Sequence, residues 1–383
     1  MRTNIVKAAV CLTAAATFLP TAPAHAAETA LVAPGAPMRV FPSDMPQTLT
    51  NKRGQTLKVP PAVFAATCSQ GPAGTVRLPD GTTRRVMLTA AHCVESQPGK
   101  RPVSPEVKVP QGKDYVRVGV RDRSSNPPAA ALDLSDPMLS VQTSDWGVVL
   151  IDDAVRSTNQ STSRSQAGRQ QGAPVQLTSI KDYRTLRPGE VAVDNFGQPI
   201  CKDGATTGRS CGTQLGRTRN GVYSWGLNYD HGDSGGVNFD PRDGSVIGVS
   251  SLVLGPLGKT QPADRAIEDA YGVPDGQVNR TFQLSHPEAP RAEFPTTNEE
   301  SNNVDQYILE NNPDFKPAAP KDPKQELNKA VGAAQQDAQV VADQALRGQV
   351  NPAEVSQKID QHLGQINYWG GKALANELTQ VLR

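Results

Sequence analysis

The feature that most restricts the fold of this chain is a series of short β-rich runs separated by turn residues, between Leu57 and about Gly258. Clear runs cover residues 75–78, 85–88, 115–118, 146–151 and 246–253, and Pro79-Asp80-Gly81 is a typical turn between the first two. No helical period is interleaved with these runs. They therefore predict an antiparallel barrel or sandwich of about 200 residues.

The regions on either side of these runs have a different character, and 383 residues are too many for one ordinary domain. Residues 27–56 are polar and contain proline, which predicts an N-terminal arm or a short propeptide. Residues 261–320 are irregular and Pro-rich, which predicts an extended linker. Asp322 as N-cap and Pro323 at the first helical position then begin a helical pattern, so residues 321–383 predict a small helical module.

Residues 1–26 have the features of a secretory signal peptide. Arg2 and Lys7 give a positive start, residues 8–19 form the apolar run, and Ala24-His25-Ala26 is a small-x-small cleavage site. The apolar run is shorter than the roughly 20 residues that span a bilayer. The chain is therefore expected to be secreted, with cleavage near Ala26 and no membrane span.

Four cysteines remain once Cys11 leaves with the signal peptide: Cys68, Cys93, Cys201 and Cys211. An even number in an exported chain predicts two disulfides, for which three pairings exist. A zinc site is disfavoured because the sequence contains no CxxC spacing. No metal and no other cofactor are expected.

Charge is unevenly distributed along the chain. Residues 1–262 hold 28 of the 39 basic and 20 of the 38 acidic side chains, and residues 263–383 hold the remaining 11 and 18. The two parts are chemically different, and neither is basic enough to indicate nucleic acid as the main partner.

The string Gly232-Asp233-Ser234-Gly235-Gly236 indicates chemistry most directly. A serine hydroxyl is a weak nucleophile at neutral pH, so it needs a base to take its proton and donors to hold the oxyanion. Glycines beside a serine allow the amides of Gly232 and Ser234 to point into one small hole. Alone, such a string is more often an ordinary turn, so the interpretation depends on partners elsewhere.

Thr89-Ala90-Ala91-His92-Cys93 supplies a candidate base. Small residues before His92 allow close packing, and a disulfide at the next residue would fix the position of the imidazole. His231 lies three residues before Ser234 and is expected to line the cleft. The other histidines lie in the signal peptide, the Pro-rich segment and the tail: His25, His286 and His362.

A carboxylate that orients the histidine is expected at the start of a buried strand. Asp145 directly precedes the apolar run from Trp146 onward and fits this position. The rival carboxylates lie in a turn-like context or follow the strand: Asp133, Asp136, Asp152 and Asp153. The predicted order is His92, Asp145, Ser234.

Together the strings TAAHC, DWGVVL and GDSGG, in this order, resemble the chymotrypsin-like serine endopeptidases of the trypsin clan. Residues 201–212, CKDGATTGRSCG, are similar to the C-x-x-G-x-T-T-G-x-x-C-G disulfide loop of the bacterial branch that includes the alpha-lytic and Streptomyces proteases. The resemblance covers about residues 57–260. It implies an all-β fold of two antiparallel six-stranded barrels, here followed by a small helical C-terminal extension.

The resemblance also implies an activity and roles for individual residues. The chain is expected to be a secreted serine endopeptidase that hydrolyses peptide bonds through an acyl-enzyme intermediate. His92 is implied to be the general base and then the general acid, Asp145 its orienter and Ser234 the nucleophile. The amides of Gly232 and Ser234 are implied to form the oxyanion hole.

The family pattern further implies the disulfides Cys68–Cys93 and Cys201–Cys211. It places a basic residue after the first cysteine of the 201–211 loop, facing the acidic residue before the serine. Here these residues are Lys202 and Asp233. Lysine in place of the expected arginine removes the bidentate pairing.

Substrate binding is implied for Asn228 and for the edge residues Ser251, Leu252 and Val253, on which a peptide adds a strand through backbone hydrogen bonds. Relatives usually carry a cysteine where this chain has Asn228, and no cysteine follows Cys211. The specificity pocket is therefore less constrained than in those relatives. Asp230 offers a charge for a basic side chain, and an apolar or mixed preference is the alternative.

A second functional class is a protease-fold binding or adhesion protein with little or no turnover, against which the complete set of three catalytic residues argues. An HtrA-type protease is disfavoured because no β-rich pattern follows residue 258. The expected partners are protein or peptide substrates. For the acidic tail two roles are open, docking on the basic catalytic domain or tethering to a partner.

Overall fold

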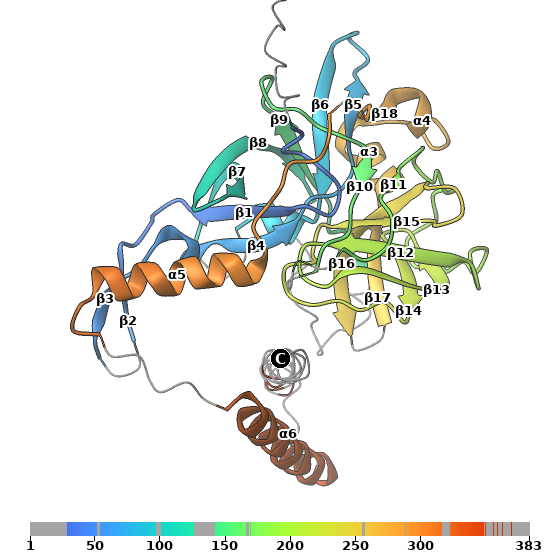
Figure 1. Ribbon diagram of the computed structural model, residues 1–383. Helices are drawn as coiled ribbons and strands as arrows, with labels where there is room; N and C mark the ends of the chain where they lie inside the picture. The colour runs from blue at the N-terminus through green and yellow to red at the C-terminus, as the bar shows by residue number, and fades with distance from the viewer. Residues whose placement is uncertain are drawn as a thin grey trace, which may run out of the picture.

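The computed structural model describes residues 29–51, 54–96, 101–125, 142–165, 168, 170–254, 257–287, 289–315, 322–347 and 349, and single positions 355, 358, 362 and 369. The predicted signal peptide lies outside these residues. Within them the chain is mostly β, with two sheet structures side by side and helices at their margins (Figure 1).

The first half of the chain forms an eight-stranded antiparallel sheet in the order β18-β5-β6-β9-β8-β7-β1-β4. Its strands are β1 (Pro37–Pro42), β4 (Ala66–Ser69), β5 (Ala73–Arg77), β6 (Thr83–Thr89), β7 (Val103–Gln111), β8 (Asp114–Ser124), β9 (Gly147–Ile151) and β18 (Phe282–Leu284). Short pieces accompany it: β2 (Thr48–Thr50), β3 (Thr56–Lys58), the 3-10 turn η1 (Pro61–Phe64) and α1 (Ala91–Val94).

This sheet curls round on itself because β4 and β5 are two parts of one stretch of chain. Only residues 70–72 separate them, yet β4 pairs with β1 at one end of the order and β5 pairs with β6 near the other. Gly71 is needed at the break, since a Cβ there would lie 2.3 Å from the Leu88 carbonyl oxygen. If β4 and β5 count as one strand and β18 as an addition, six strands remain, as predicted.

The second half is a closed six-stranded barrel in the order β12-β13-β14-β17-β16-β15. Its strands are β12 (Pro199–Gly204), β13 (Gly208–Thr218), β14 (Gly221–Trp225), β15 (Val237–Phe239), β16 (Val246–Leu254) and β17 (Leu257–Pro262). The two-stranded ribbon of β10 (Gln160–Ser161) and β11 (Val175–Gln176) precedes it. The predicted all-β class is confirmed.

The two halves share hydrophobic packing. One cluster of buried residues contains Val76 and Leu88 from the first sheet, Val237 and Phe239 from the second, and Ile267 from a helix that follows it. Apolar side chains in contact across this boundary hold the sheets together through burial of their surface. Segments that lie far apart in sequence are thereby fixed beside each other.

The expected N-terminal arm is part of the barrel from Pro37 onward. All six residues of β1 are buried, and it pairs with both β4 and β7. A strand covered on both faces shows no polar and apolar alternation, so the sequence did not display a strand period there. The arm therefore supplies a central strand.

The expectation of an extended linker at 261–320 is wrong for much of that segment. It contains α3 (Ala263–Tyr271), α4 (Val278–Thr281), β18 and α5 (Thr297–Asn311). The prolines that suggested a linker lie between these elements instead: Pro274, Pro287, Pro290 and Pro295. Proline is tolerated at element boundaries, so a high proline content marks short, frequent elements here.

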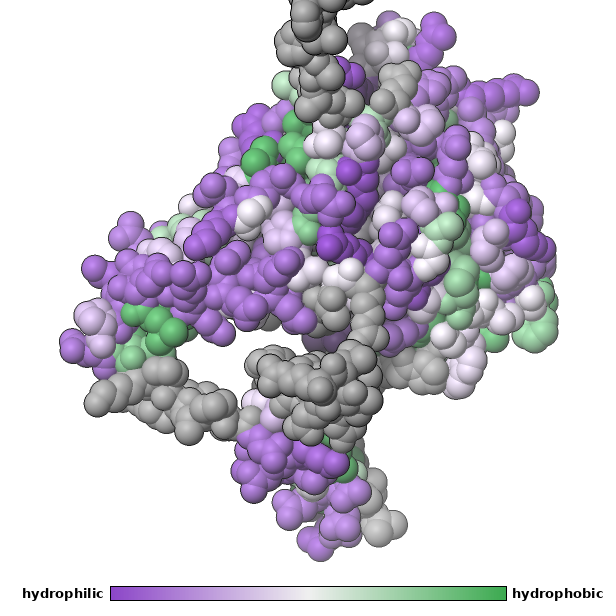
Figure 2. All heavy atoms as spheres, in the orientation of Figure 1, coloured by the Kyte–Doolittle hydropathy of each residue, from purple (hydrophilic) through white to green (hydrophobic). Residues whose placement is uncertain are grey.

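α5 is fixed to the first sheet by a buried ion pair. Thr296 and Glu299 form a reciprocal capping box at its start, and Glu300 in its first turn pairs with Arg39 of β1. The helix runs along the outer side of this sheet (Figure 1). Its surface is mostly hydrophilic in Figure 2, with a hydrophobic patch near the end beside the β2–β3 hairpin.

The tail begins as predicted with α6 (Pro323–Leu346). The Asp322 carboxylate accepts a hydrogen bond from the Lys324 N–H at 2.9 Å, which is N-cap geometry. Asp337 of α6 pairs with Lys358 and His362, which belong to later helical turns. Among the helices that the structure describes, none is long and apolar enough to cross a membrane.

Candidate active site

The loop between β14 and β15 carries the predicted nucleophile. Gly232 and Gly235 have φ angles of +99° and +80°, a region that L residues with a side chain rarely adopt. A Cβ on Gly232 would also lie 2.3 Å from the Thr206 hydroxyl oxygen. The glycines of the GDSGG string are therefore required by both backbone conformation and space, and they present Ser234 between two tight bends.

His92 and Asp145 lie in direct contact, although 53 residues separate them. The imidazole Nδ1 is 2.9 Å from Asp145 Oδ2, and the His92 backbone N–H donates to Oδ1 at 3.0 Å. Asp145 is fully buried, whereas the His92 side chain retains 19% exposure. The carboxylate thus fixes both the ring and the backbone of the histidine and leaves part of the ring accessible.

Two further residues hold the Asp145 carboxylate and backbone. The Ser251 hydroxyl donates to Oδ2 at 2.6 Å, and the Asp145 N–H donates to Gln261 Oε1 at 2.8 Å. Both partners belong to the second barrel, so the pair between His92 and Asp145 lies at the junction of the two sheets.

The pKa of His92 reflects opposing effects. Burial of the imidazole alone would lower its pKa, but the charge of Asp145 and the hydrogen bond to it outweigh burial, so the pKa is raised above its usual value. Burial likewise lowers the pKa of Lys259 to about 8, against the attraction of Asp145. The Lys259 amine donates to the Thr143 carbonyl at 2.5 Å.

The nucleophile loop packs directly against the turn that carries His92. A Cβ at Gly235 would lie 2.2 Å from the Thr89 hydroxyl oxygen and 3.3 Å from the Ala90 nitrogen. Ser234 is thus next to a residue that touches the start of the histidine turn. The structure thus brings His92 and Asp145 into contact and packs the Ser234 loop against the start of the histidine turn.

Ser69 of β4 positions the carbonyl groups of this loop. Its N–H donates to the Ser234 carbonyl at 2.8 Å, and its hydroxyl donates to the Gly232 carbonyl at 2.6 Å. The Ser69 side chain also accepts from the Ala205 N–H at 2.8 Å. Because both carbonyls are held on the Ser69 side, the peptide groups of the loop have a fixed orientation.

The N–H groups of the loop divide into two sets. Those of Asp233, Gly235 and Gly236 donate to the carbonyls of Asp230, Ser250 and Asp233 respectively. Among the residues that the structure describes, the N–H groups of Gly232 and Ser234 have no protein acceptor. Two unused donors separated by one residue are what an oxyanion hole requires.

Lys202 and Asp233 form the buried ion pair that the sequence indicated. Lys202 Nζ lies 2.8 Å from Asp233 Oδ2, and both side chains have almost no exposure. Burial lowers the pKa of the Lys202 amine, although Asp233 opposes that change. The pair ties the residue before Ser234 to β12.

Residues of the 201–212 motif contact the Asp233 carboxylate directly. The N–H groups of Thr206 and Thr207 each donate to Asp233 Oδ1 at 3.0 Å. A Cβ at Gly204 would lie 2.4 Å from the same oxygen, so glycine is required there. The spaced glycine and threonines therefore build a cradle for the carboxylate next to the nucleophile.

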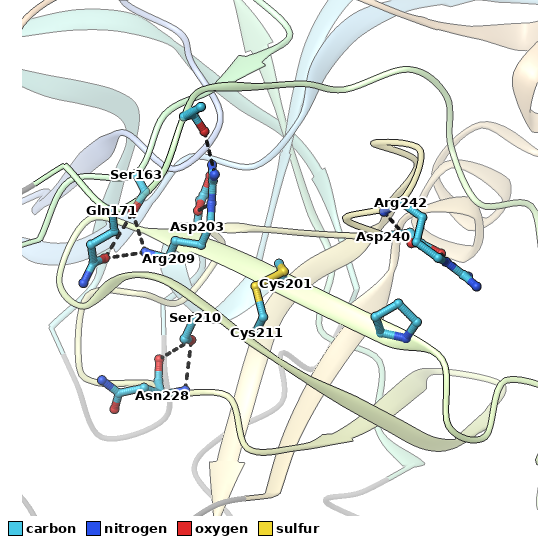
Figure 3. Close-up of a disulfide and its surroundings, with 12 residues drawn as sticks. Ser163, Gln171, Cys201, Asp203, Arg209, Ser210, Cys211, Asn228, Asp240 and Arg242 are labelled. Atoms are coloured by element: carbon cyan, nitrogen blue, oxygen red, sulfur yellow. Dashed lines mark hydrogen bonds and ion pairs between the residues drawn. A yellow bond between two sulfur atoms is a disulfide. The ribbon is translucent and has the colours of Figure 1, made fainter.

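The two disulfides are those that the family pattern implied, Cys68–Cys93 and Cys201–Cys211. The first joins β4 to the turn that carries His92. The second joins β12 to β13 beside Ser210, whose hydroxyl contacts the backbone of Asn228 (Figure 3). Each disulfide therefore stiffens one side of the candidate site.

The predicted substrate-binding residues lie around an open strand edge. β15 pairs with β16 only as far as Val249, whereas β17 pairs with Leu252 and Val253 on the other side. The Ser250 backbone bonds to Gly235 and Gly236 of the nucleophile loop, and beyond Ser250 this edge has no strand partner among the described residues. Asn228 lies in the loop before the nucleophile, with its backbone bonded to Ser210 and Thr207.

The rival candidates are placed elsewhere or remain untested. Asp133 and Asp136 lie outside the described residues. Asp152 pairs with Arg117 at 2.8 Å, so its position is explained by a surface ion pair. His231 is exposed in the nucleophile loop, three residues before Ser234, as expected for a residue that lines the cleft.

Sequence reasoning missed Ser69, Gln261 and the partly buried Tyr229 of the nucleophile loop. Ser69 follows Cys68 directly, so its proximity to the disulfide was the available signal. Gln261 carried no signal, because its contact with Asp145 spans 116 residues. The role of Tyr229 likewise depends on its tertiary contacts.

Potential metal ligands occur in two places among the described residues. Cys68, His92 and Cys93 are close, but both cysteines are in a disulfide and cannot act as thiolate ligands. Asp182, Glu268 and Asp275 also approach one another. These carboxylates accept hydrogen bonds from Val278 and Thr185.

Comparison with known proteins gives structural neighbours of the expected kind. No protein-family model matches the chain, and no curated protein matches it. The Nocardiopsis protease NAPase is 20% identical with a TM-score of 0.36, the match covering 57% of this chain and 93% of that one. Thermobifida fusca Protease A is 19% identical with a TM-score of 0.36, covering 67% and 98%.

A third neighbour is a chymotrypsin from Cellulomonas bogoriensis, 20% identical with a TM-score of 0.34, covering 63% of this chain and 96% of that one. All three neighbours are bacterial proteases.

Proposed function

We propose that this protein is a secreted serine endopeptidase that uses Ser234 as nucleophile, His92 as base and Asp145 as orienter. The observation that carries the proposal is the hydrogen-bonded pair of His92 and fully buried Asp145 beside the loop of Ser234. The signal-like N-terminus and the two disulfides support export to an oxidising compartment.

In the proposed mechanism, His92 Nε2 takes the proton of the Ser234 hydroxyl as its oxygen attacks the scissile carbonyl carbon. Asp145 accepts the Nδ1 hydrogen and stabilises the imidazolium that forms. The N–H groups of Gly232 and Ser234 donate to the oxyanion of the tetrahedral intermediate. His92 then donates its proton to the leaving amine, and the acyl group remains on Ser234.

In the second half-reaction, water hydrolyses the acyl-enzyme, and Ser234 becomes the leaving group. Water enters the space left by the amine, and His92 takes a proton from it as the water oxygen attacks the ester carbonyl. Collapse of the second tetrahedral intermediate breaks the bond to Ser234, and the serine oxygen takes the proton back from His92. Both products leave and the site is restored.

The substrate is proposed to be an extended peptide. The open edge at Ser251, Leu252 and Val253 offers backbone groups to which a further antiparallel strand can bind. Such pairing is independent of most side chains, so a protein or peptide substrate fits this edge.

A fluorophosphonate probe tests the proposal directly, because an activated serine attacks its phosphorus atom, displaces fluoride and becomes phosphonylated. We expect labelling of Ser234 in folded mature protein and none in the Ser234→Ala variant. Cleavage-site profiling of a peptide library should give products with the first protein and none with the second. A folded protein that is neither labelled nor active would favour the alternative, a protease-fold binding or adhesion protein.

A further inference from the structure

Tyr229 lies in the loop before the nucleophile, and its ring packs beside β17. The inference drawn from this ring rests on the proposed function. In that function a peptide would pair along Ser251 to Val253 with its carbonyl carbon at Ser234, and its side chain before the cleaved bond would point between residues 228–231 and β17. The occupant of this space decides which side chains can bind there.

The Tyr229 ring crosses this space and reaches the far wall. Gly258 of β17 pairs with Val253 of β16, so it lies directly behind the open edge. A Cβ at Gly258 would lie 2.6 Å from Tyr229 Cε2 and 3.3 Å from Cζ. The ring therefore packs against bare backbone in the wall, and glycine is required there to make room for it.

The ring is held at its hydroxyl end by a buried hydrogen-bond network. The Tyr229 hydroxyl accepts a hydrogen bond from Asn238 Nδ2 at 3.4 Å, and Asn238 is fully buried. Asn238 is itself fixed by Thr260 at 2.5 Å and by the hydroxyl of Ser250 at 3.1 Å. Ring displacement would leave these buried polar groups short of a partner, which is costly in a protein interior.

A cation adds to this restraint. Lys202 Nζ, the same amine that pairs with Asp233, lies 5.3 Å from the centroid of the Tyr229 ring. Tyr229 is thus fixed to the ion pair behind the nucleophile as well as to the barrel wall. A side chain held from three directions does not move aside readily for a substrate.

We propose that Tyr229 forms the floor of the primary specificity pocket and restricts this protease to small side chains before the cleaved bond. Glycine, alanine and serine fit above the ring, whereas leucine, phenylalanine and lysine would collide with it. The preference is not assigned to Asp230, whose carboxylate accepts a hydrogen bond from the His231 N–H at 2.7 Å within the same loop.

The test compares the native protein with Tyr229→Ala, Tyr229→Phe and Tyr223→Ala in peptide-library profiling. We expect the native protein to prefer alanine over phenylalanine by at least about tenfold in kcat/KM, a discrimination typical of steric exclusion. Tyr229→Ala should reverse or abolish that preference. Tyr229→Phe retains the ring and should keep it.

Tyr223→Ala is the matched control. Tyr223 is a partly buried tyrosine in the same barrel, and its hydroxyl contacts Thr218. Its neighbour Ser224 faces Gly258, the wall against which Tyr229 packs. Because side chains alternate along β14, the Tyr223 ring lies on the opposite face. Removing this ring should leave the preference unchanged. Rates are expressed per probe-labelled Ser234, so that partial unfolding of a variant does not imitate a change in specificity.

Two results would overturn the proposal: a native preference for large side chains, or an unchanged small preference in Tyr229→Ala. Binding to the Ser234→Ala variant separates this proposal from the proposed function, since it needs no turnover. Calorimetry should show that the Ser234→Ala variant binds a peptide ending in alanine more tightly than one ending in phenylalanine. In the double variant with Tyr229→Ala, this difference in affinity should be lost. Equal affinities for both peptides would contradict the pocket even if the protein proved inactive.

Discussion

Ser69 shows how one side chain from the first sheet determines the shape of a loop in the second. It bonds the carbonyls of both Gly232 and Ser234, which fixes the 232–233 and 234–235 peptide units. Each of these units directly follows a residue whose N–H has no acceptor among the described residues, Gly232 and Ser234. The proposed oxyanion hole therefore depends on a residue some 160 positions earlier in the chain.

Replacing Ser69 by alanine should lower kcat while leaving KM nearly unchanged. The Gly232 carbonyl would lose its bond, which is typically worth about 1 kcal/mol, and the 232–233 peptide unit between the two N–H donors would be held less firmly. Steady-state kinetics on one peptide substrate measure this split. Ser96→Ala is a suitable control, because Ser96 lies outside the site and its hydroxyl bonds Val103.

Lys202 and Asp233 allow a second prediction at this scale. Lys202→Met should reduce the free energy of unfolding by about 3–5 kcal/mol, since it leaves a buried carboxylate without its cation. Adding Asp233→Asn should restore part of that loss by removing the charge. Urea unfolding in the Ser234→Ala background avoids self-digestion, and equal stability of single and double variants would contradict the pairing.

The pH dependence of activity should follow His92. The imidazole must be neutral to accept the Ser234 proton, and its pKa is raised above the usual 6.5. Activity is therefore present above that raised pKa and is lost as the pH falls through it. The acid limb of a kcat/KM profile measures this value, and NMR titration of His92 in Ser234→Ala should give a matching one. A midpoint below 6.5 would contradict the raised pKa.

At the scale of elements, local patterns in the sequence were sufficient for five of the described strands, β5, β6, β8, β9 and β16, and for the start of α6. They were insufficient for β1, because a strand buried on both faces has no alternation. They also failed for residues 261–320, where prolines punctuate short elements. The three candidate catalytic residues could be proposed from the sequence because each lies in a short motif, whereas Ser69, Gln261 and Tyr229 act through contacts that no motif records.

β18 is one of the elements that the linker prediction missed, and the contribution of its packing to stability can be tested. Phe282 is buried in the shared hydrophobic cluster, and its ring lies where a Cβ on Gly74 would be. Phe282→Ala should lower the free energy of unfolding by about 3–5 kcal/mol, the usual range for a buried phenylalanine. Gln283→Ala, at the exposed neighbouring position, should change it little. Urea unfolding curves of both variants measure the difference.

At the scale of the whole molecule, the tail and the catalytic body are expected to be separable. The ion pairs described for Asp337 in α6 run to Lys358 and His362, which are also in the tail. Deleting residues 321–383 should leave the melting temperature and probe labelling of Ser234 unchanged. A decrease in melting temperature that disappears at high salt would instead show that the acidic tail docks on the basic body.

The pairing of β18 with β5 has a consequence for the order in which the chain folds. Residues near 75 receive a neighbour from residues near 283, so the first sheet is finished by one of the last strands to be synthesised. Contacts of such long sequence separation are slow to form, and an unpaired edge is a site for aggregation until they do. A nascent chain that ends near residue 260 would therefore carry the whole candidate triad on a sheet that is still open at β5. Chaperoning and the timing of export would act on this intermediate.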